Sequence, residues 1–214
     1  MRFAALVAAI CSVLVGCGGH AHPTRAGDSR VAKASVITLR DFPPGWSGDD
    51  QHLRNSVACD AIQAAMKAAN AVESTDVFSH GGDAQAEFAV YVFPDPARAQ
   101  RAFRAIAARS MRRCLGARLA TAVKDAKTVT HVDHPKAGPE TVPAVGDRQA
   151  GTHVVIGFAN GKLVREFDAD LTAVATRRGL SLGLFVNIGN SFDERLRERL
   201  TSIEADRLSH ALAQ

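Results

Sequence analysis

The feature that most constrains the fold of this chain is a run of strand-like segments between residues 145 and 187. A strand is predicted over residues 149–158, and Asn160-Gly161 follows it, the dipeptide most typical of a tight turn between antiparallel strands. A partner strand begins at Lys162, and a further pair over 171–176 and 180–186 turns at 177–179. The residues leave open whether 162–176 is one strand or two. This run predicts an antiparallel sheet.

Other strands and loops are predicted outside this run. Residues 87–93 are β-branched and aromatic on both faces, which indicates a central strand. Residues 36–39 and 128–134 are predicted as shorter strands, the first ended by Pro43-Pro44-Gly45. Residues 72–83 and 136–143 are rich in Gly, Ser or Pro and are predicted as loops.

Three segments have a helical period. The first starts at Asn55 or Ser56 and runs to Val72, the second opens at Asp95-Pro96, and the third follows a capping-box pattern at 191–194 and runs to Leu212. Their inner faces are Cys59, Ile62, Met66 and Ala69; Phe103, Ile106, Ser110 and Cys114; and Leu196, Leu200, Ile203 and Leu208. The prediction is one α+β domain over residues 34–214, an antiparallel β-sheet packed with two to three helices.

The N-terminal segment predicts export. Arg2 precedes an apolar stretch of about a dozen residues, as in a secretory signal, whereas a membrane-spanning helix needs about 20. Leu14-Val15-Gly16-Cys17 resembles a bacterial lipobox. The resemblance implies removal of residues 1–16 and linkage of Cys17 to diacylglycerol, with palmitate, which anchors the chain on the extracytoplasmic face of the cell membrane. An ordinary cleaved signal and an uncleaved anchor are the alternatives.

The residues after the anchor lack any hydrophobic period. Residues 17–33 contain Gly, Pro and polar residues and are predicted to be a flexible tether. His20 and His22 lie in this segment as a close pair that could bind a metal or remain solvated; we expect the second.

Two cysteines remain after Cys11 leaves with the signal and Cys17 takes lipid: Cys59 and Cys114. In an exported domain such a pair most simply forms a disulfide. A metal pair needs further ligands nearby, and a redox pair usually has the Cys-x-x-Cys spacing. The sequence therefore predicts one disulfide between the inner faces of the first two helices.

Two further features suggest binding surfaces. Trp46, the only tryptophan, either fills the core beside the Pro-Pro-Gly turn or lines a ligand pocket. The outer side of the second helix is arginine-rich and is either a patch for anionic lipid headgroups or an ordinary solvated face. Its members are Arg98, Arg101, Arg104, Arg109, Arg112 and Arg113.

No catalytic residue, metal site or cofactor is predicted. The common hydrolase, metalloprotease and nucleotide-binding motifs do not occur, and a net charge of +4 does not suggest a nucleic-acid partner. The acidic pairs Asp49-Asp50 and Asp168/Asp170 remain, the second on one strand face that either holds a cation or is simply exposed. His131 and Asp133 share a face and His134 points away, which argues against a metal site there.

The segment 39–46, Leu-Arg-Asp-Phe-Pro-Pro-Gly-Trp, resembles the opening of actinobacterial exported domains, in which two cysteines flank a strand–helix unit. A Val-Gly-Asp stretch, here 145–147, precedes the C-terminal hairpin in that family, which includes mycobacterial envelope lipoproteins and the PknH-like extracellular sensor domain. The resemblance covers residues 36–210. It implies an antiparallel sheet with helices on it and a cleft for a small ligand, and it implies no reaction.

The favoured hypothesis is a non-enzymatic, lipid-anchored envelope protein with a sensor-like domain that binds a lipid, glycan or protein. The alternatives are an envelope hydrolase with dispersed catalytic residues and a structural or accessory interaction protein. The lining of the largest cleft separates them: an aromatic groove favours binding, a convergent His–carboxylate–Ser set favours hydrolysis, and a flat surface favours the accessory role.

Overall fold

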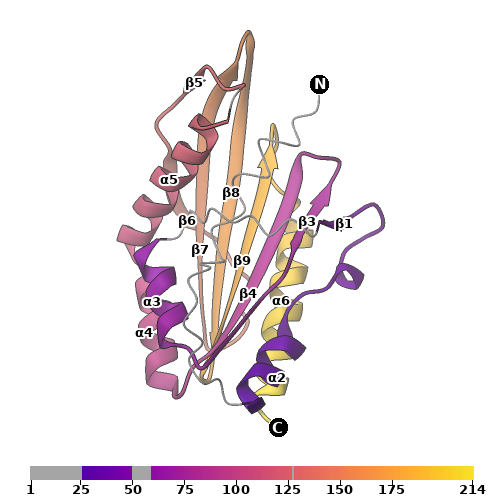
Figure 1. The fold of residues 1–214 in the computed structure, drawn as a ribbon, viewed down its shortest axis with the longest axis vertical. Coiled ribbons are helices and arrows are strands. Elements are labelled where there is room, and N and C mark those ends of the chain that lie inside the picture. The colour runs from indigo at the N-terminus through magenta and orange to yellow at the C-terminus, as the bar shows by residue number, and fades with distance from the viewer. Residues whose placement is uncertain (1–25, 50–58, 127) are drawn as a thin grey trace.

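A computed structural model describes residues 26–49, 59–126 and 128–214 (Figure 1). Its elements are, in order, α2 (Ala26–Ser35), η2 (Leu39–Asp41), β1 (Ser47–Asp49), α3 (Asp60–Ala68), β2 (Ala71–Ser74), β3 (Val77–His80), β4 (Ala84–Val92), α4 (Pro96–Ile106), α5 (Arg109–Lys124), β5 (His131–Val132), β6 (Lys136–Glu140), β7 (Arg148–Asn160), β8 (Leu163–Thr176), β9 (Gly179–Ile188) and α6 (Glu194–Ala211). Cys17 and the lipobox lie outside the described residues.

The nine described strands form one antiparallel sheet in the order β1-β3-β4-β9-β8-β7-β5, with β2 also paired to β4 and β6 to β7. The predicted hairpin is present: Asn160 pairs with Leu163 around Gly161, whose φ of 60° suits glycine. Residues 163–176 form one continuous strand, which settles the question that the sequence left open. The predicted central strand is β4, which has partners on both edges.

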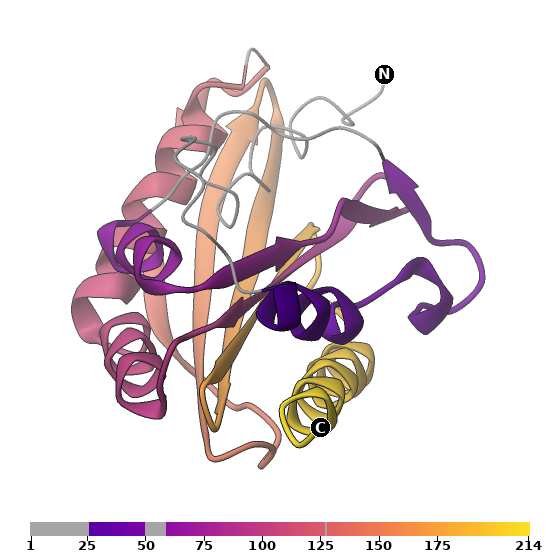
Figure 2. The same cartoon turned by 60° about the horizontal axis from the view of Figure 1, so that its bottom comes forward.

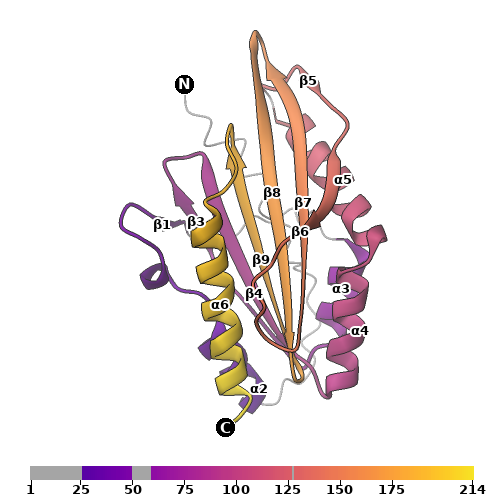
Figure 3. The same ribbon diagram turned by 180° about the vertical axis from the view of Figure 1, so that it is seen from behind.

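Helices cover both faces of the sheet. Figure 2 shows α3, α4 and α5 on one side and α2 and α6 on the other, and Figure 3 shows α6 lying along the second face. Alternate residues of the long strands enter the two layers: Phe167, Ala169 and Leu171 belong to the core beneath α4 and α5. The α+β prediction is confirmed, with five α-helices among the described residues where two to three were expected.

The disulfide between Cys59 and Cys114 is confirmed, with 6.0 Å between their Cα atoms. It joins the N-cap of α3 to α5. The predicted second helix, however, is divided at Ala107 and Ala108 into α4 and α5. Neither alanine disfavours a helix, so the break follows from packing: after it, Met111 turns into the same core as the residues of α4.

The predicted tether is wrong over its second half, because residues 26–35 form α2. Asp28 is 4% exposed and pairs with Arg178 (Oδ1–Nη2 2.7 Å), and it also accepts a hydrogen bond from Asn70 (2.8 Å). Ala32 packs against Val90 and Leu208. These partners come from remote parts of the chain, so the local composition of residues 17–33 does not reveal them.

Five other local predictions also fail in whole or in part. Residues 36–39 are not a strand, because Asp41 accepts hydrogen bonds from the backbone N–H and hydroxyl of Thr38 and closes η2. The first helix ends at Ala68, and the supposed loop 72–83 contains β2 and β3. Lys136–Glu140 is a strand rather than a loop, since it pairs with β7. The predicted strand 128–134 contains only the two residues of β5.

The C-terminal helix is present, with one change at its start. Asp193 is the N-cap and accepts a hydrogen bond from the Leu196 N–H at 2.9 Å, where the sequence suggested Ser191. Among the described helices, none is long and apolar enough to cross a membrane.

Candidate functional site

A groove of about 380 Å³ opens on the α6 face of the sheet, where α6 begins. Its wall residues come from the segment before β1, from three strands and from the start of α6. They are Pro43, Pro44, Trp46, His80, Ala84, Asn187, Ser191, Phe192, Asp193 and Leu196, and the set is called the Trp46 groove below.

The register of the sheet places this groove. Asp168, Asn187, Ala84 and His80 are successive cross-strand partners on β8, β9, β4 and β3. Ala84 has only a methyl side chain, whereas its neighbours in this row, His80 and Asn187, have larger side chains that extend further from the sheet. The groove is therefore a consequence of one small residue between larger ones.

Trp46 packs into the core beside the turn and also lines the groove. Its ring packs on Phe42 (centroids 4.6 Å apart) and Phe192 (5.8 Å), and it is stacked on His80 (5.6 Å). The side chain is half-buried and lines the groove. Gly45 makes this approach possible, since its φ is 95° and a Cβ there would lie 3.1 Å from His80 Nε2.

The polar groups of the groove do not form a catalytic triad. His80, Ser191 and Asp193 all line it, but the Asp193 carboxylate caps α6 and the His80 ring is stacked on Trp46. No hydrogen bond joins any two of the three within the part of the chain that the structure describes. These groups can offer hydrogen bonds to a ligand.

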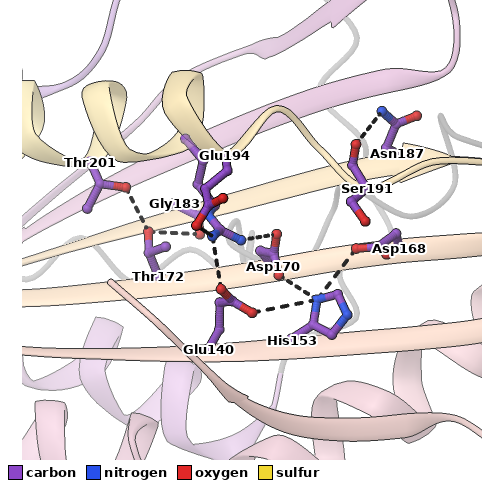
Figure 4. Close-up of polar contacts among 11 residues, drawn as sticks. Glu140, His153, Asp168, Asp170, Thr172, Gly183, Asn187, Ser191, Glu194 and Thr201 are labelled. Atoms are coloured by element: carbon purple, nitrogen blue, oxygen red, sulfur yellow. Dashed lines mark hydrogen bonds and ion pairs between the residues drawn. The ribbon is translucent and has the colours of Figure 1, made fainter. Parts of the chain in front are cut away.

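A cluster of charged residues lies beside the groove on the same face, with Asp168 as cross-strand neighbour of Asn187 (Figure 4). It is called the His153 cluster and consists of Glu140, His153, Asp168, Asp170 and Arg197. Arg197 donates to Asp170 Oδ2 (2.5 Å) and to Glu140 Oε1 (2.9 Å). His153 Nδ1 lies 2.7 Å from Asp170 Oδ1, 3.5 Å from Asp168 Oδ1 and 4.0 Å from Glu140 Oε2.

The electrostatics of this cluster follow from its excess of carboxylates. Burial raises the pKa of Asp168 to about 6; the neighbouring His153 opposes this rise, and nearby carboxylates add to it. Burial alone would lower the pKa of His153, but the hydrogen bond to Asp170 and the surrounding negative charge raise it. The cluster thus favours bound positive charge.

The sequence located only part of this cluster. Asp168 and Asp170 share a strand face as predicted, but they are 7% and 2% exposed, so the exposed-face interpretation is wrong. Glu140, His153 and Arg197 were missed. One signal was present: His153 lies seven residues before Asn160 and Asp170 seven after Leu163, so the Asn-Gly hairpin alone places them opposite each other.

The other predicted residues are dispersed. Five of the six arginines of the outer helix face are exposed and Arg112 is half-buried; they are divided between α4 and α5. Arg98 and Arg101 flank a shallow alanine-lined groove between α3 and α4, remote in sequence from the Trp46 groove. His131 and Asp133 contact each other on the surface at 3.1 Å. His20, His22 and Asp50 lie outside the described residues.

Comparison with solved structures finds the extracellular domain of PknH from Mycobacterium tuberculosis, at 10% identity over 91% of this chain and 100% of that one, with a TM-score of 0.45. LpqN, involved in cell envelope biogenesis in the same organism, is 7% identical over 76% of each chain (TM-score 0.31). The human StarD13 lipid transfer and protein localization domain is 9% identical over 65% and 83% (TM-score 0.21).

No protein-family model and no curated protein matches the chain. The identities to PknH and LpqN, 10% and 7%, are low.

Proposed function

We propose that this chain is a lipid-anchored, extracytoplasmic binding protein without catalytic activity, which takes a small envelope glycan in the Trp46 groove. The observation that carries the proposal is the mixed lining of the groove. Trp46, Phe192 and two prolines provide apolar surface, and His80, Asn187 and Asp193 provide hydrogen-bonding groups in its wall. Few convergent polar groups around an apolar wall are typical of small-molecule sites.

A glycan suits this lining better than the other ligand classes. A sugar ring presents C–H groups on its faces and hydroxyls around its edge, which matches a lining that combines aromatic and hydrogen-bonding side chains. A lipid acyl chain needs a longer, wholly apolar channel than a groove of about 380 Å³ with histidine, asparagine and aspartate in its wall. A protein partner would favour a broad flat surface over this narrow site.

The single tryptophan makes the test direct, because all indole fluorescence reports on the groove. We expect envelope-type oligosaccharides to change that fluorescence saturably, and His80→Ala to weaken binding by about tenfold, the effect of losing one good hydrogen bond to a ligand. His134→Ala, an exposed histidine that does not line the groove, is the matched control. Equal affinity in both variants would place the ligand elsewhere.

Mass spectrometry of the oligosaccharide after prolonged incubation tests the absence of catalysis. An unchanged ligand mass supports a binding protein. A hydrolysed product whose formation requires His80 or Asp193 would favour the envelope hydrolase instead.

The anchor is tested separately. We expect the wild-type chain in the membrane fraction with a mass increased by lipid, and Cys17→Ala in the aqueous fraction. A Cys17→Ala chain that stays with the membrane without lipid would contradict the lipobox assignment.

A further inference from the structure

Two carboxylates of the His153 cluster, Asp170 and Glu140, each bind Arg197 with one oxygen and turn the other toward His153. Asp170 and Glu140 give Oδ2 and Oε1 to Arg197, while Asp170 Oδ1 and Glu140 Oε2 face His153 Nδ1. Arg197 therefore holds these two carboxylates in place from behind. On the front side, one oxygen each from Asp170 and Glu140 lies near His153 Nδ1, and Asp168 Oδ1 lies 3.5 Å from the same nitrogen (Figure 4).

Asp168 supplies an independent indication of a ligand. The residue is 7% exposed, and its Oδ1 is buried without a hydrogen-bond partner. This oxygen lies 3.5 Å from His153 Nδ1, and the Nδ1 is already engaged at 2.7 Å with Asp170. A buried carboxylate oxygen without a hydrogen-bond donor is costly, and a bound cation would satisfy it.

The spacing of the converging atoms fits a metal. Zinc bonds of about 2.0–2.2 Å in a tetrahedral site place neighbouring ligand atoms about 3.4 Å apart. The three distances from His153 Nδ1 are 2.7, 3.5 and 4.0 Å, and they scatter around that value. The ligand atoms of Glu140, His153 and Asp170 all lie within 4.8 Å of one another.

The charge fits as well. The cluster contains three carboxylates and one guanidinium, so it has an excess of negative charge when His153 is neutral. One divalent cation would neutralise this excess and would take the place of the proton on Nδ1. Protonation of His153 would neutralise only part of this negative charge.

We propose that Glu140, His153, Asp168 and Asp170 form a binding site for a divalent transition-metal ion, with zinc as the best match. An imidazole ligand favours zinc over calcium or magnesium, which prefer oxygen donors alone. Arg197 is a positioning residue that holds two of the ligands. The ion has a path in, because the His153 and Glu140 side chains are 32% and 21% exposed.

The test uses the full mature chain, stripped of metal with a chelator and titrated with zinc by calorimetry at neutral pH. We expect one equivalent to bind, Asp168→Asn to weaken it by about tenfold, and His153→Gln by more. Asp168→Asn keeps the shape of the side chain, so it remains informative if His153→Gln fails to fold. The matched control is His131→Gln, which alters the exposed His131–Asp133 contact and should leave zinc affinity unchanged.

Two further measurements make the outcome decisive. Cobalt should give the visible absorption of a tetrahedral ion in the wild type and lose it in His153→Gln, and magnesium and calcium should not compete. A variant with both His20→Gln and His22→Gln removes the N-terminal histidine pair, which is the alternative zinc-binding group. The proposal is overturned if the wild type binds no zinc, if His153→Gln binds it equally well, or if only the His20/His22 variant loses it.

Discussion

The two faces of strand β8 have opposite chemistry although they alternate along one segment of chain. Phe167, Ala169 and Leu171 enter the apolar layer under α4 and α5. Asp168, Asp170 and Thr172, equally buried, face α6. Burial of these polar groups is offset because residues of α6 interact with them: Arg197 binds Asp170, and Thr201 lies 3.4 Å from Thr172. A buried strand face can therefore be polar where a helix supplies matching groups.

The comparison also separates two kinds of stability. The apolar layer gains from the area removed from water and, at its edge, from a covalent cross-link between Cys59 and Cys114. The polar layer depends on specific partners, and losing one partner leaves the other charge buried and unpaired. The predictions below test this difference.

The largest effect is expected from Arg197→Met, which keeps the volume near the original but removes the guanidinium between Asp170 and Glu140. Because Asp170 is 2% exposed, we expect the free energy of unfolding to fall by about 3–5 kcal/mol. Arg195→Met, an exposed residue on the same helix, is the control and should change stability by less than about 0.5 kcal/mol. Similar losses in the two variants would show that the cluster adds nothing specific. Urea unfolding measures both.

The second-largest effect is expected from loss of the disulfide at the edge of the apolar layer. Replacing Cys59 and Cys114 together by Ala removes a cross-link between residues 55 apart in the sequence. We expect the free energy of unfolding to fall by about 2–4 kcal/mol, because the unfolded chain gains conformational freedom. The polar groups on the α6 face should be unaffected. Unchanged zinc affinity in the double variant would show that the His153 cluster does not depend on the disulfide. Free thiols in the denatured, unreduced wild type would instead contradict the disulfide itself.

The sequence predicted what local patterns determine. The Asn160-Gly161 hairpin, strand β4 and helix α6 were predicted from turn chemistry and hydrophobic period, and the disulfide was predicted from the expectation of export and the count of remaining cysteines. Helix α2 and strand β6 were missed because distant partners stabilise them: Arg178 binds Asp28, and β7 pairs with β6. The His153 cluster combines residues from four elements, β6, β7, β8 and α6, and only the β7–β8 part of it can be predicted from the hairpin register.

A smaller effect is expected in the pH dependence of metal-free protein. Since the fold raises the pKa of Asp168 to about 6, the folded state retains a proton that an unfolded aspartate loses near pH 4. The raised pKa of His153 acts in the same direction: its contribution is full below the unfolded pKa of about 6.5 and is lost at higher pH. Stability should therefore fall as pH rises from about 4 through 6 and beyond.

The Asp168→Asn variant isolates one group in this trend. Glu87 and Glu204 are buried with raised pKa values and contribute with the same sign, so only the difference between wild type and variant is informative. We expect the loss of stability between about pH 4 and 7 to be smaller by about 2 kcal/mol in the variant. Parallel pH profiles of the two proteins would contradict a raised Asp168 pKa.

The smallest effect is expected where the same chemical pair lies at the surface. His131 and Asp133 contact each other at 3.1 Å, and His153 and Asp170 do so at 2.7 Å. The side chains of His131 and Asp133, however, are 71% and 61% exposed. Water screens their interaction and competes for their hydrogen bonds, so His131→Gln should change the free energy of unfolding by less than about 0.5 kcal/mol. His153→Gln should cost at least about 1 kcal/mol more, because Asp170 loses a partner in a buried site. Equal costs would mean that burial by α6 does not distinguish the two pairs, and the contrast between the faces of the sheet would then rest on Arg197 alone.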